Sequence, residues 1–158
     1  MRCESFLGDL VESACDCLVV GIDEAWRESA EIREINAAMD GLLGQLIEAE
    51  EISTKPMKIT QIVAPAGVKA KQLIAVGLGD RKSVLPSVYS RAAAAALKTA
   101  ASKKRSLVRV VGFQGTPIVM RGAVSGAMVG CVAKTSFEKK NRYFSRTVSS
   151  GLASTKTP

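Results

Sequence analysis

The sequence contains no histidine, few aromatic residues and no long uninterrupted apolar run. Without histidine, the chain cannot form the serine–histidine or cysteine–histidine pairs of many hydrolases, or a histidine-bearing zinc site. Aromatic residues make up 4% of the chain, so the core must be aliphatic and rich in alanine. The longest stretch of low charge, residues 117–133, is interrupted by Arg121 and is shorter than the roughly 18 apolar residues of a membrane span. We find no targeting segment and no membrane partner, and we expect a cytoplasmic protein.

Cysteine is also scarce, with only Cys3, Cys15, Cys17 and Cys131. No C-x-x-C motif occurs, and the single C-x-C is a weak metal signal, so we interpret the cysteines as reduced thiols, two of them packed as small hydrophobic residues. The early acidic residues lack the D-x-D-x-D-G spacing of a calcium loop. These residues are Asp9, Glu12, Asp16, Asp23, Glu24 and Glu28. We therefore expect no metal or other cofactor in this chain.

The charge of the 158 residues is unevenly distributed. Residues 1–52 hold 3 Lys and Arg against 13 Asp and Glu, a net charge of −10, whereas residues 53–158 hold 19 against 2, a net charge of +17. A chain of 158 residues has the length of one domain. The separation of charge indicates either complementary faces or an anionic partner.

Apolar runs rich in β-branched residues alternate with helical patterns along the chain. The runs predict strands at residues 17–22, 59–63, 73–78 and 107–113, with a weaker candidate at 2–7. Helices are predicted over residues 86–102, where consecutive alanines give a slim face, and over residues 117–133, which contain glycines spaced by four. This alternation predicts a three-layer α/β domain.

Between the strands predicted at residues 17–22 and 59–63, the apolar residues predict one helical stripe. Its members follow steps of 3 and 4 residues: Ile32, Ile35, Met39, Leu42 and Leu46. Gly41 and Gly44 weaken this helix by about 1 kcal/mol each relative to alanine, so they mark either a break or a close contact.

Two features are candidate binding sites. Gly77 and Gly79 follow a strand and precede a helix, where a phosphate-binding turn would lie. Lys82 stands where a G-x-G-x-x-G motif has its third glycine, so the favoured alternative is a plain strand-to-helix turn that needs flexible backbone. Basic residues gather in two clusters, which suit either an anionic ligand or a solvated face. The first holds Lys98, Lys103, Lys104, Arg105 and Arg109, and the second holds Lys134, Lys139, Lys140, Arg142 and Arg146. No arrangement of nucleophile, base and oxyanion donor is recognisable, so we name no catalytic residue.

Several segments together resemble a known family. They are Cys17-Leu18-Val19-Val20-Gly21-Ile22, the helical pattern around 35–46, Ala75-Val76-Gly77-Leu78-Gly79, the alanine-rich stretch 91–97, Gly122-Ala123 with Gly126, and Lys139-Lys140-Asn141-Arg142-Tyr143. In this order and spacing they resemble the N-terminal domain of the leucyl aminopeptidase family. The resemblance covers roughly residues 1–144, and residues 145–158 are interpreted as a linker or a disordered tail.

The resemblance implies a macro-like fold, in which a mixed sheet lies between helices, and a domain that is not itself catalytic. It further implies a separate catalytic domain that holds two divalent metals (zinc, manganese or magnesium) and assembly into hexamers. The family's Asn-Thr-Asp-Ala-Glu-Gly-Arg signature does not occur in this chain, so no metal ligand is assigned here.

Three functional hypotheses remain open. The first is a domain for packing and oligomer assembly in such an enzyme. The second is a nucleic-acid-binding module, with DNA as the partner of Lys103, Lys104 and Arg105 and of Lys139, Lys140 and Arg142. The third is a macro-like nucleotide-binding module centred on Gly77 and Gly79.

Overall fold

The computed structural model describes residues 2–4, 11, 12, 14–83 and 85–113. The predicted helix at 117–133, the second basic cluster and the tail at 145–158 lie outside these residues. The elements, in chain order, are β1 (Arg2–Glu4), β2 (Cys17–Asp23), the 3-10 helix η1 (Trp26–Glu28), α1 (Ala30–Ala38), α2 (Leu42–Glu48), β3 (Ile59–Val63), β4 (Gln72–Gly79), α3 (Pro86–Ala100) and β5 (Leu107–Val111). The four longer strands match the predicted ones within a few residues.

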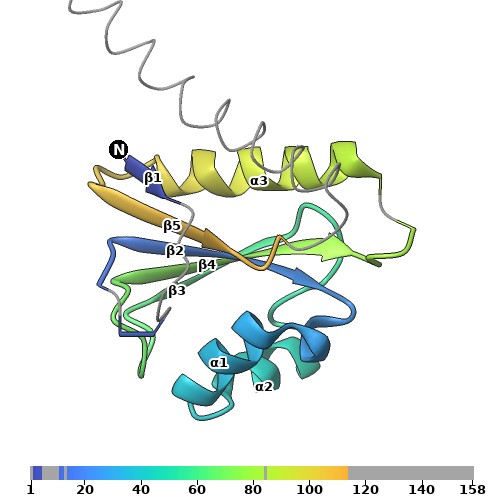
Figure 1. Ribbon diagram of the computed structural model, residues 1–158, viewed down its shortest axis with the longest axis horizontal. Helices are drawn as coiled ribbons and strands as arrows, with labels where there is room; N and C mark the ends of the chain where they lie inside the picture. The colour runs from blue at the N-terminus through green and yellow to red at the C-terminus, as the bar shows by residue number, and fades with distance from the viewer. Residues whose placement is uncertain (1, 5–10, 13, 84, 114–158) are drawn as a thin grey trace, which may run out of the picture.

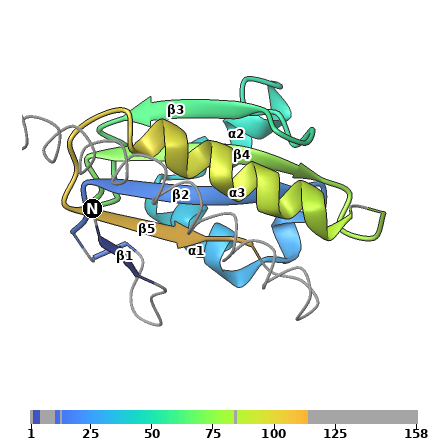
Figure 2. The same ribbon diagram turned by 90° about the horizontal axis from the view of Figure 1, so that it is seen from above.

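The strands form one sheet in the order β1-β5-β2-β4-β3 (Figures 1 and 2). β1, β5, β2 and β4 run parallel, whereas β3 pairs antiparallel with β4. β2 and β4 occupy the middle of the sheet, and every residue of both strands is buried. The sheet is therefore mixed, as the family resemblance implied.

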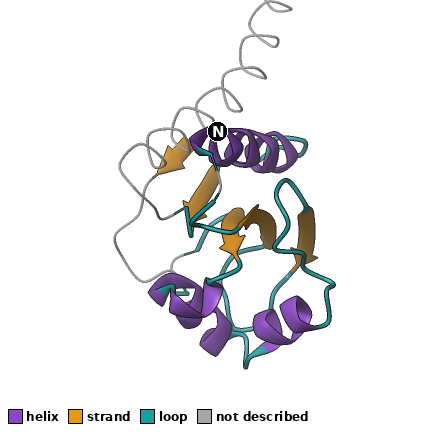
Figure 3. Ribbon diagram, turned by 90° about the vertical axis from the view of Figure 1, so that its right-hand side faces the viewer, coloured by secondary structure: helices purple, strands orange, loops and turns teal. Residues whose placement is uncertain are grey.

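Helices cover both faces of this sheet, with α3 on one face and η1, α1 and α2 on the other (Figures 1 and 3). Because side chains alternate along a strand, each central strand contributes to both cores. In β2, Leu18, Val20 and Ile22 join the cluster that contains α1 and α2, whereas Cys17 and Val19 join the cluster under α3. The predicted three-layer α/β/α architecture is confirmed.

The predicted helical stripe does not continue beyond Met39, and of the two alternatives left open for Gly41 the structure shows a break. α1 ends there because Asp40 and Gly41 adopt left-handed conformations, with φ of 52° and 81°, and a second helix starts at Leu42. This break shifts the helical phase by one residue. Leu42 is therefore exposed and Leu46 only partly buried, and two neighbouring residues, Leu43 and Ile47, enter the core in their place.

The alanine-rich helix α3 lies close on the sheet, as its slim face predicted. Its buried face consists largely of Ala92, Ala93, Ala96 and Ala100. Small side chains allow the helix backbone to approach β2 and β4, so this layer has little room for larger groups.

Candidate functional site

The glycines of the predicted ligand turn lie at the carboxyl end of β4, against residues 53–58. The N–H of Gly77 donates to the carbonyl of Lys58 at 2.8 Å, and the N–H of Gly79 donates to the carbonyl of Thr54 at 2.8 Å. A Cβ atom at Gly77 would lie 2.0 Å from the carbonyl oxygen of Lys55. Both amide hydrogens are thus used within the domain, and an anionic ligand for this turn would have to displace residues 53–58.

A partly buried ion pair lies at the same end of the sheet. The Nε of Arg81 donates to Oδ2 of Asp23 at 2.7 Å, and the Asp23 side chain is only 4% exposed. Asp23 ends β2 and is paired with Gly79, so the contact connects the ends of the two central strands. Burial, together with the charge of Asp23, raises the pKa of Tyr89 above its usual value. This hydroxyl therefore stays protonated through the physiological pH range.

At the opposite end of the sheet, Asp16 connects three parts of the chain. Its carboxylate accepts hydrogen bonds from Nζ of Lys71 at 2.7 Å, from the N–H of Ser106 at 2.7 Å and from the N–H of Leu107 at 3.2 Å. These bonds, the one from Lys71 first, lower the pKa of Asp16 to about 2. Asp16 is therefore ionised at neutral pH and holds the start of β5 beside the start of β2.

The first basic cluster divides in the structure. Arg105 turns inward, where Nε donates to the carbonyl of Ala100 at 2.7 Å, Nη1 donates to the carbonyl of Asp16 at 3.1 Å and Nη2 donates to Oε1 of Gln72. Arg109 is buried. The exposed members are Lys98, Lys103 and Lys104. Within this first cluster, only the three lysines have the exposure that an anionic partner requires, because the guanidinium of Arg105 is used to join α3 to the sheet.

The early acidic residues do not converge on one point. Asp16 directly precedes β2 and Asp23 ends it, so they lie about 23 Å apart at 3.3 Å per residue, while Glu24 and Glu28 are exposed beyond the carboxyl end of β2. Asp9 lies outside the described residues, and Glu12 forms an ion pair with Lys69. Among the described residues, no group of three or more Cys, Asp or Glu side chains is placed to hold a metal ion.

The C-x-C motif is divided between the two faces of the sheet. Cys15 belongs to the core beside α1 and α2, whereas Cys17 belongs to the core under α3. Burial raises the pKa of Cys17 to about 11 and also raises the pKa of Cys15. Both are free, buried thiols, which agrees with their interpretation as small hydrophobic residues.

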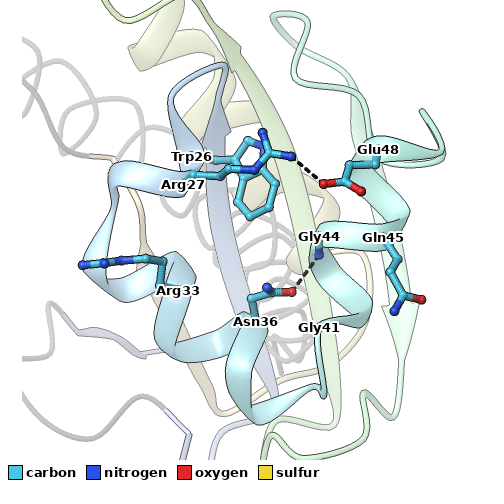
Figure 4. Close-up of a pocket in the computed structure, with 8 residues that line it drawn as sticks. All are labelled: Trp26, Arg27, Arg33, Asn36, Gly41, Gly44, Gln45 and Glu48. Atoms are coloured by element: carbon cyan, nitrogen blue, oxygen red, sulfur yellow. Dashed lines mark hydrogen bonds and ion pairs between the residues drawn. The ribbon is translucent and has the colours of Figure 1, made fainter.

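An open pocket of about 370 Å³ lies between η1, α1 and α2 (Figure 4). The Arg27 guanidinium stacks on the Trp26 ring, 4.6 Å from its centroid, and pairs with Glu48 at 2.5 Å. Oδ1 of Asn36 accepts a hydrogen bond from the N–H of Gly44 at 2.7 Å. A Cβ atom at Gly44 would lie 3.0 Å from the Trp26 ring, so this glycine serves a close contact. Figure 4 thus draws two bonded polar pairs in the pocket wall, Arg27 with Glu48 and Asn36 with Gly44, and no bond for the side chains of Arg33 and Gln45.

The sequence model of the cytosol aminopeptidase family, N-terminal domain, matches residues 19–133, which is most of the chain. This chain belongs to the cytosol aminopeptidase family. The match begins within β2 and includes the central strands, both helical layers and β5. The expected family is therefore confirmed, and the chain corresponds to the N-terminal domain of its members.

Relatives in the cytosol aminopeptidase family are much longer than this chain. A probable cytosol aminopeptidase of Paraburkholderia xenovorans (strain LB400) is 33% identical over 56% of this chain and 18% of its own length. A probable cytosol aminopeptidase of Methylobacillus flagellatus is 32% identical over 52% of this chain and 17% of its own length. The matched region thus spans less than a fifth of these relatives.

The macrodomain of Mycobacterium tuberculosis DarG has a similar fold, with a TM-score of 0.58 over 79% of this chain and 89% of that domain. Its sequence identity is 11%, so the likeness concerns the fold alone. None of the helices in the described part of the chain combines the length and apolarity needed to cross a membrane.

Two polar connections of this cytosol aminopeptidase domain were not predicted from its sequence, the Asp23–Arg81 pair and the inward guanidinium of Arg105. The first had a local signal, because a carboxylate that directly follows a fully apolar strand is buried at its end and needs a cationic partner. Arg105 had no such signal, since its contacts with Asp16 are 89 positions away along the chain.

Proposed function

We propose that this chain is the non-catalytic N-terminal domain of a leucyl aminopeptidase-like enzyme that releases N-terminal amino acids from peptides in the cytoplasm. The observation that carries the proposal is the match of residues 19–133 to this domain of the family. In such an enzyme, hydrolysis belongs to a separate catalytic domain with two divalent metals, zinc, manganese or magnesium. These metals polarise the peptide carbonyl and activate the attacking water.

The domain's own role in this proposal is packing against the catalytic domain and assembly of the hexamer. The distribution of charge over the structure supports such a role. The layer formed by η1, α1, α2 and the following turn exposes Glu34, Asp40, Glu48, Glu50 and Glu51, among others. The other layer exposes Arg91 and Lys98 along α3, and Lys103 and Lys104 beyond its end. Two faces of opposite charge suit complementary contacts between neighbouring domains.

The proposal is tested by reading the source DNA beyond the codon of Pro158 and expressing the whole reading frame. We expect a second domain, hydrolysis of a leucine anilide that a chelator abolishes, and the mass of a hexamer by light scattering. The 158-residue chain alone is the control and is expected to be inactive. A stop codon directly after Pro158, or a longer product without chelator-sensitive hydrolysis, would overturn the proposal.

Nucleic-acid binding is a second candidate function, supported by the exposure of Lys98, Lys103 and Lys104 around the C-terminal end of α3. Binding through phosphates weakens steeply with salt because counterions are released. Fluorescence anisotropy with a labelled DNA duplex should therefore show binding at about 50 mM salt that is largely lost by about 200 mM.

The double variant Lys103→Glu/Lys104→Glu should abolish this binding. Lys55→Glu/Lys58→Glu, which changes the net charge equally at a distant site, should weaken it less. No binding at low salt, or equal loss in both double variants, would exclude a site at the end of α3.

A further inference from the structure

β3 is an edge strand of the sheet, so one side of its backbone has no neighbouring strand (Figure 2). On its inner side, the carbonyl of Lys58 accepts the N–H of Gly77, and the N–H of Ala64 donates to the carbonyl of Lys71. Backbone groups of an antiparallel strand alternate in direction. The N–H and C=O groups of Ile59, Gln61 and Val63 therefore point outward, and no described residue forms a hydrogen bond with them.

As far as the described residues extend, β3 carries none of the sequence features that commonly prevent strand pairing. Natural edge strands are commonly very short, or carry lysine, proline or a bulge. β1, at the other edge, has only 3 residues, whereas β3 has 5, with the sequence Ile-Thr-Gln-Ile-Val. It contains no charge and no proline, and its register with β4 is regular. Val63 is 72% exposed, the highest value among the exposed large hydrophobic side chains of the described residues.

A second copy of the same strand is complementary to this edge. With antiparallel pairing about a two-fold axis through Gln61, Ile59 lies opposite the partner's Val63, and Val63 lies opposite the partner's Ile59. Because these positions present their backbone groups outward, each opposed pair exchanges both of its hydrogen bonds. The pairing covers Val63 with an apolar side chain and places no like charges opposite each other, as the strand is uncharged.

We propose that β3 is a homotypic docking edge, through which two copies of this chain pair antiparallel and join their sheets. The proposal deepens the assembly role proposed above by naming its surface and partner. A strand of 5 residues covers far less than the roughly 1,200 Å² of a stable interface. The isolated chain therefore dimerises weakly, and the contact becomes strong only where other contacts in an oligomer hold the copies together.

The first test is sedimentation velocity of the 158-residue chain from about 10 µM to about 1 mM. We expect the average mass to rise with concentration toward that of a dimer. Val63→Lys should weaken dimerisation at least tenfold, because the lysine lies opposite the partner's Ile59. Leu85→Lys is the matched control, since Leu85 is 66% exposed and lies outside the edge. A monomer at every concentration, or equal loss of dimer in both variants, would overturn the proposal.

The second test uses the register and does not depend on Val63. Directly opposed residues of a hydrogen-bonded pair lie about 5.5 Å apart at Cα, within disulfide range. Gln61→Cys should therefore yield a covalent dimer on mild oxidation. Thr60→Cys, one position along, is not opposite its own copy and should yield much less. Equal cross-linking of both variants would exclude this register. Neither experiment requires the catalytic domain, so their failure would leave the proposed aminopeptidase function untouched.

Discussion

The two helical layers of this domain are attached to the same sheet by different means. The layer of α1 and α2 uses large aliphatic side chains, among them Ile32, Ile35 and Leu43, which are at most 1% exposed. The layer of α3 uses alanines, and its C-terminal end is held by Arg105, which donates to the carbonyls of Ala100 and Asp16. A slim helix buries less apolar area per residue. The comparison indicates that the packing of α3 is stabilised more by charged contacts and by the close approach of its backbone to the sheet. The packing of α1 and α2 is stabilised more by the burial of large apolar side chains.

The largest effect is expected in the aliphatic layer. Ile35→Ala should lower the free energy of unfolding by about 2–5 kcal/mol, because a fully buried side chain is lost and a cavity remains. Urea denaturation of the 158-residue chain measures this change. The exposed neighbour Glu34→Ala serves as the control and should stay within about 0.5 kcal/mol of the parent. If Ile35→Ala and Glu34→Ala changed the free energy of unfolding equally, the result would contradict a core between α1 and the sheet.

A second prediction concerns the polar contacts that hold the start of β5 beside the start of β2. Asp16→Asn should cost about 1.5–3 kcal/mol at neutral pH, because the carboxylate accepts charge-assisted hydrogen bonds. Its folded pKa of about 2 is below the ordinary value of 3.8, so folding favours the ionised form. The stabilisation is therefore fully present above about pH 4 and is lost as the pH falls through 2.

Thermal unfolding between pH 2 and pH 6 tests this assignment. The melting temperatures of the parent and Asp16→Asn should differ most near neutral pH and converge near pH 2. A difference that does not depend on pH would show that shape, not charge, makes Asp16 important.

Overpacking tests the close approach of α3. Ala96→Leu should destabilise the domain by about 1–3 kcal/mol, because Ala96 is fully buried against the sheet. Lys98→Leu places the same side chain on the exposed face of the helix and should change stability little. Urea denaturation of both variants gives the comparison. An Ala96→Leu variant as stable as the parent would mean that α3 has space beneath it.

The smallest effect is expected on the outer surface of the α1 and α2 layer. The Arg27–Glu48 ion pair is about two-thirds exposed on each side, and exposed pairs contribute about 0.2–1 kcal/mol. Glu48→Gln should therefore shift the melting temperature only slightly, and less still at 1 M salt. A large shift that persists in high salt would indicate that the pair stabilises the fold through more than surface attraction.

The sequence predicted the elements whose signals are local. Apolar runs located the central strands, and the alanine run located α3. The phase of the α1–α2 region could not be predicted, because Gly41 is compatible with either a break or a close contact in a continuous helix. Only the left-handed backbone at Asp40 and Gly41 selects Leu43 over Leu42 for the core. Within the candidate sites, Lys103 and Lys104 are exposed as a surface cluster requires. The inward turn of Arg105 was not predictable, because its partners are distant in sequence.

The segment at residues 53–58 has a consequence for the dynamics of the domain. The amide hydrogens of Gly77 and Gly79 are bonded to its carbonyls, so they exchange with deuterated water only when the segment opens. Their exchange rates therefore measure the population in which the carboxyl end of β4 is uncovered. A ligand for that end binds only this population, and its apparent affinity is reduced by the same fraction. Two glycine amides thus report how accessible this end of the sheet is before any ligand is known.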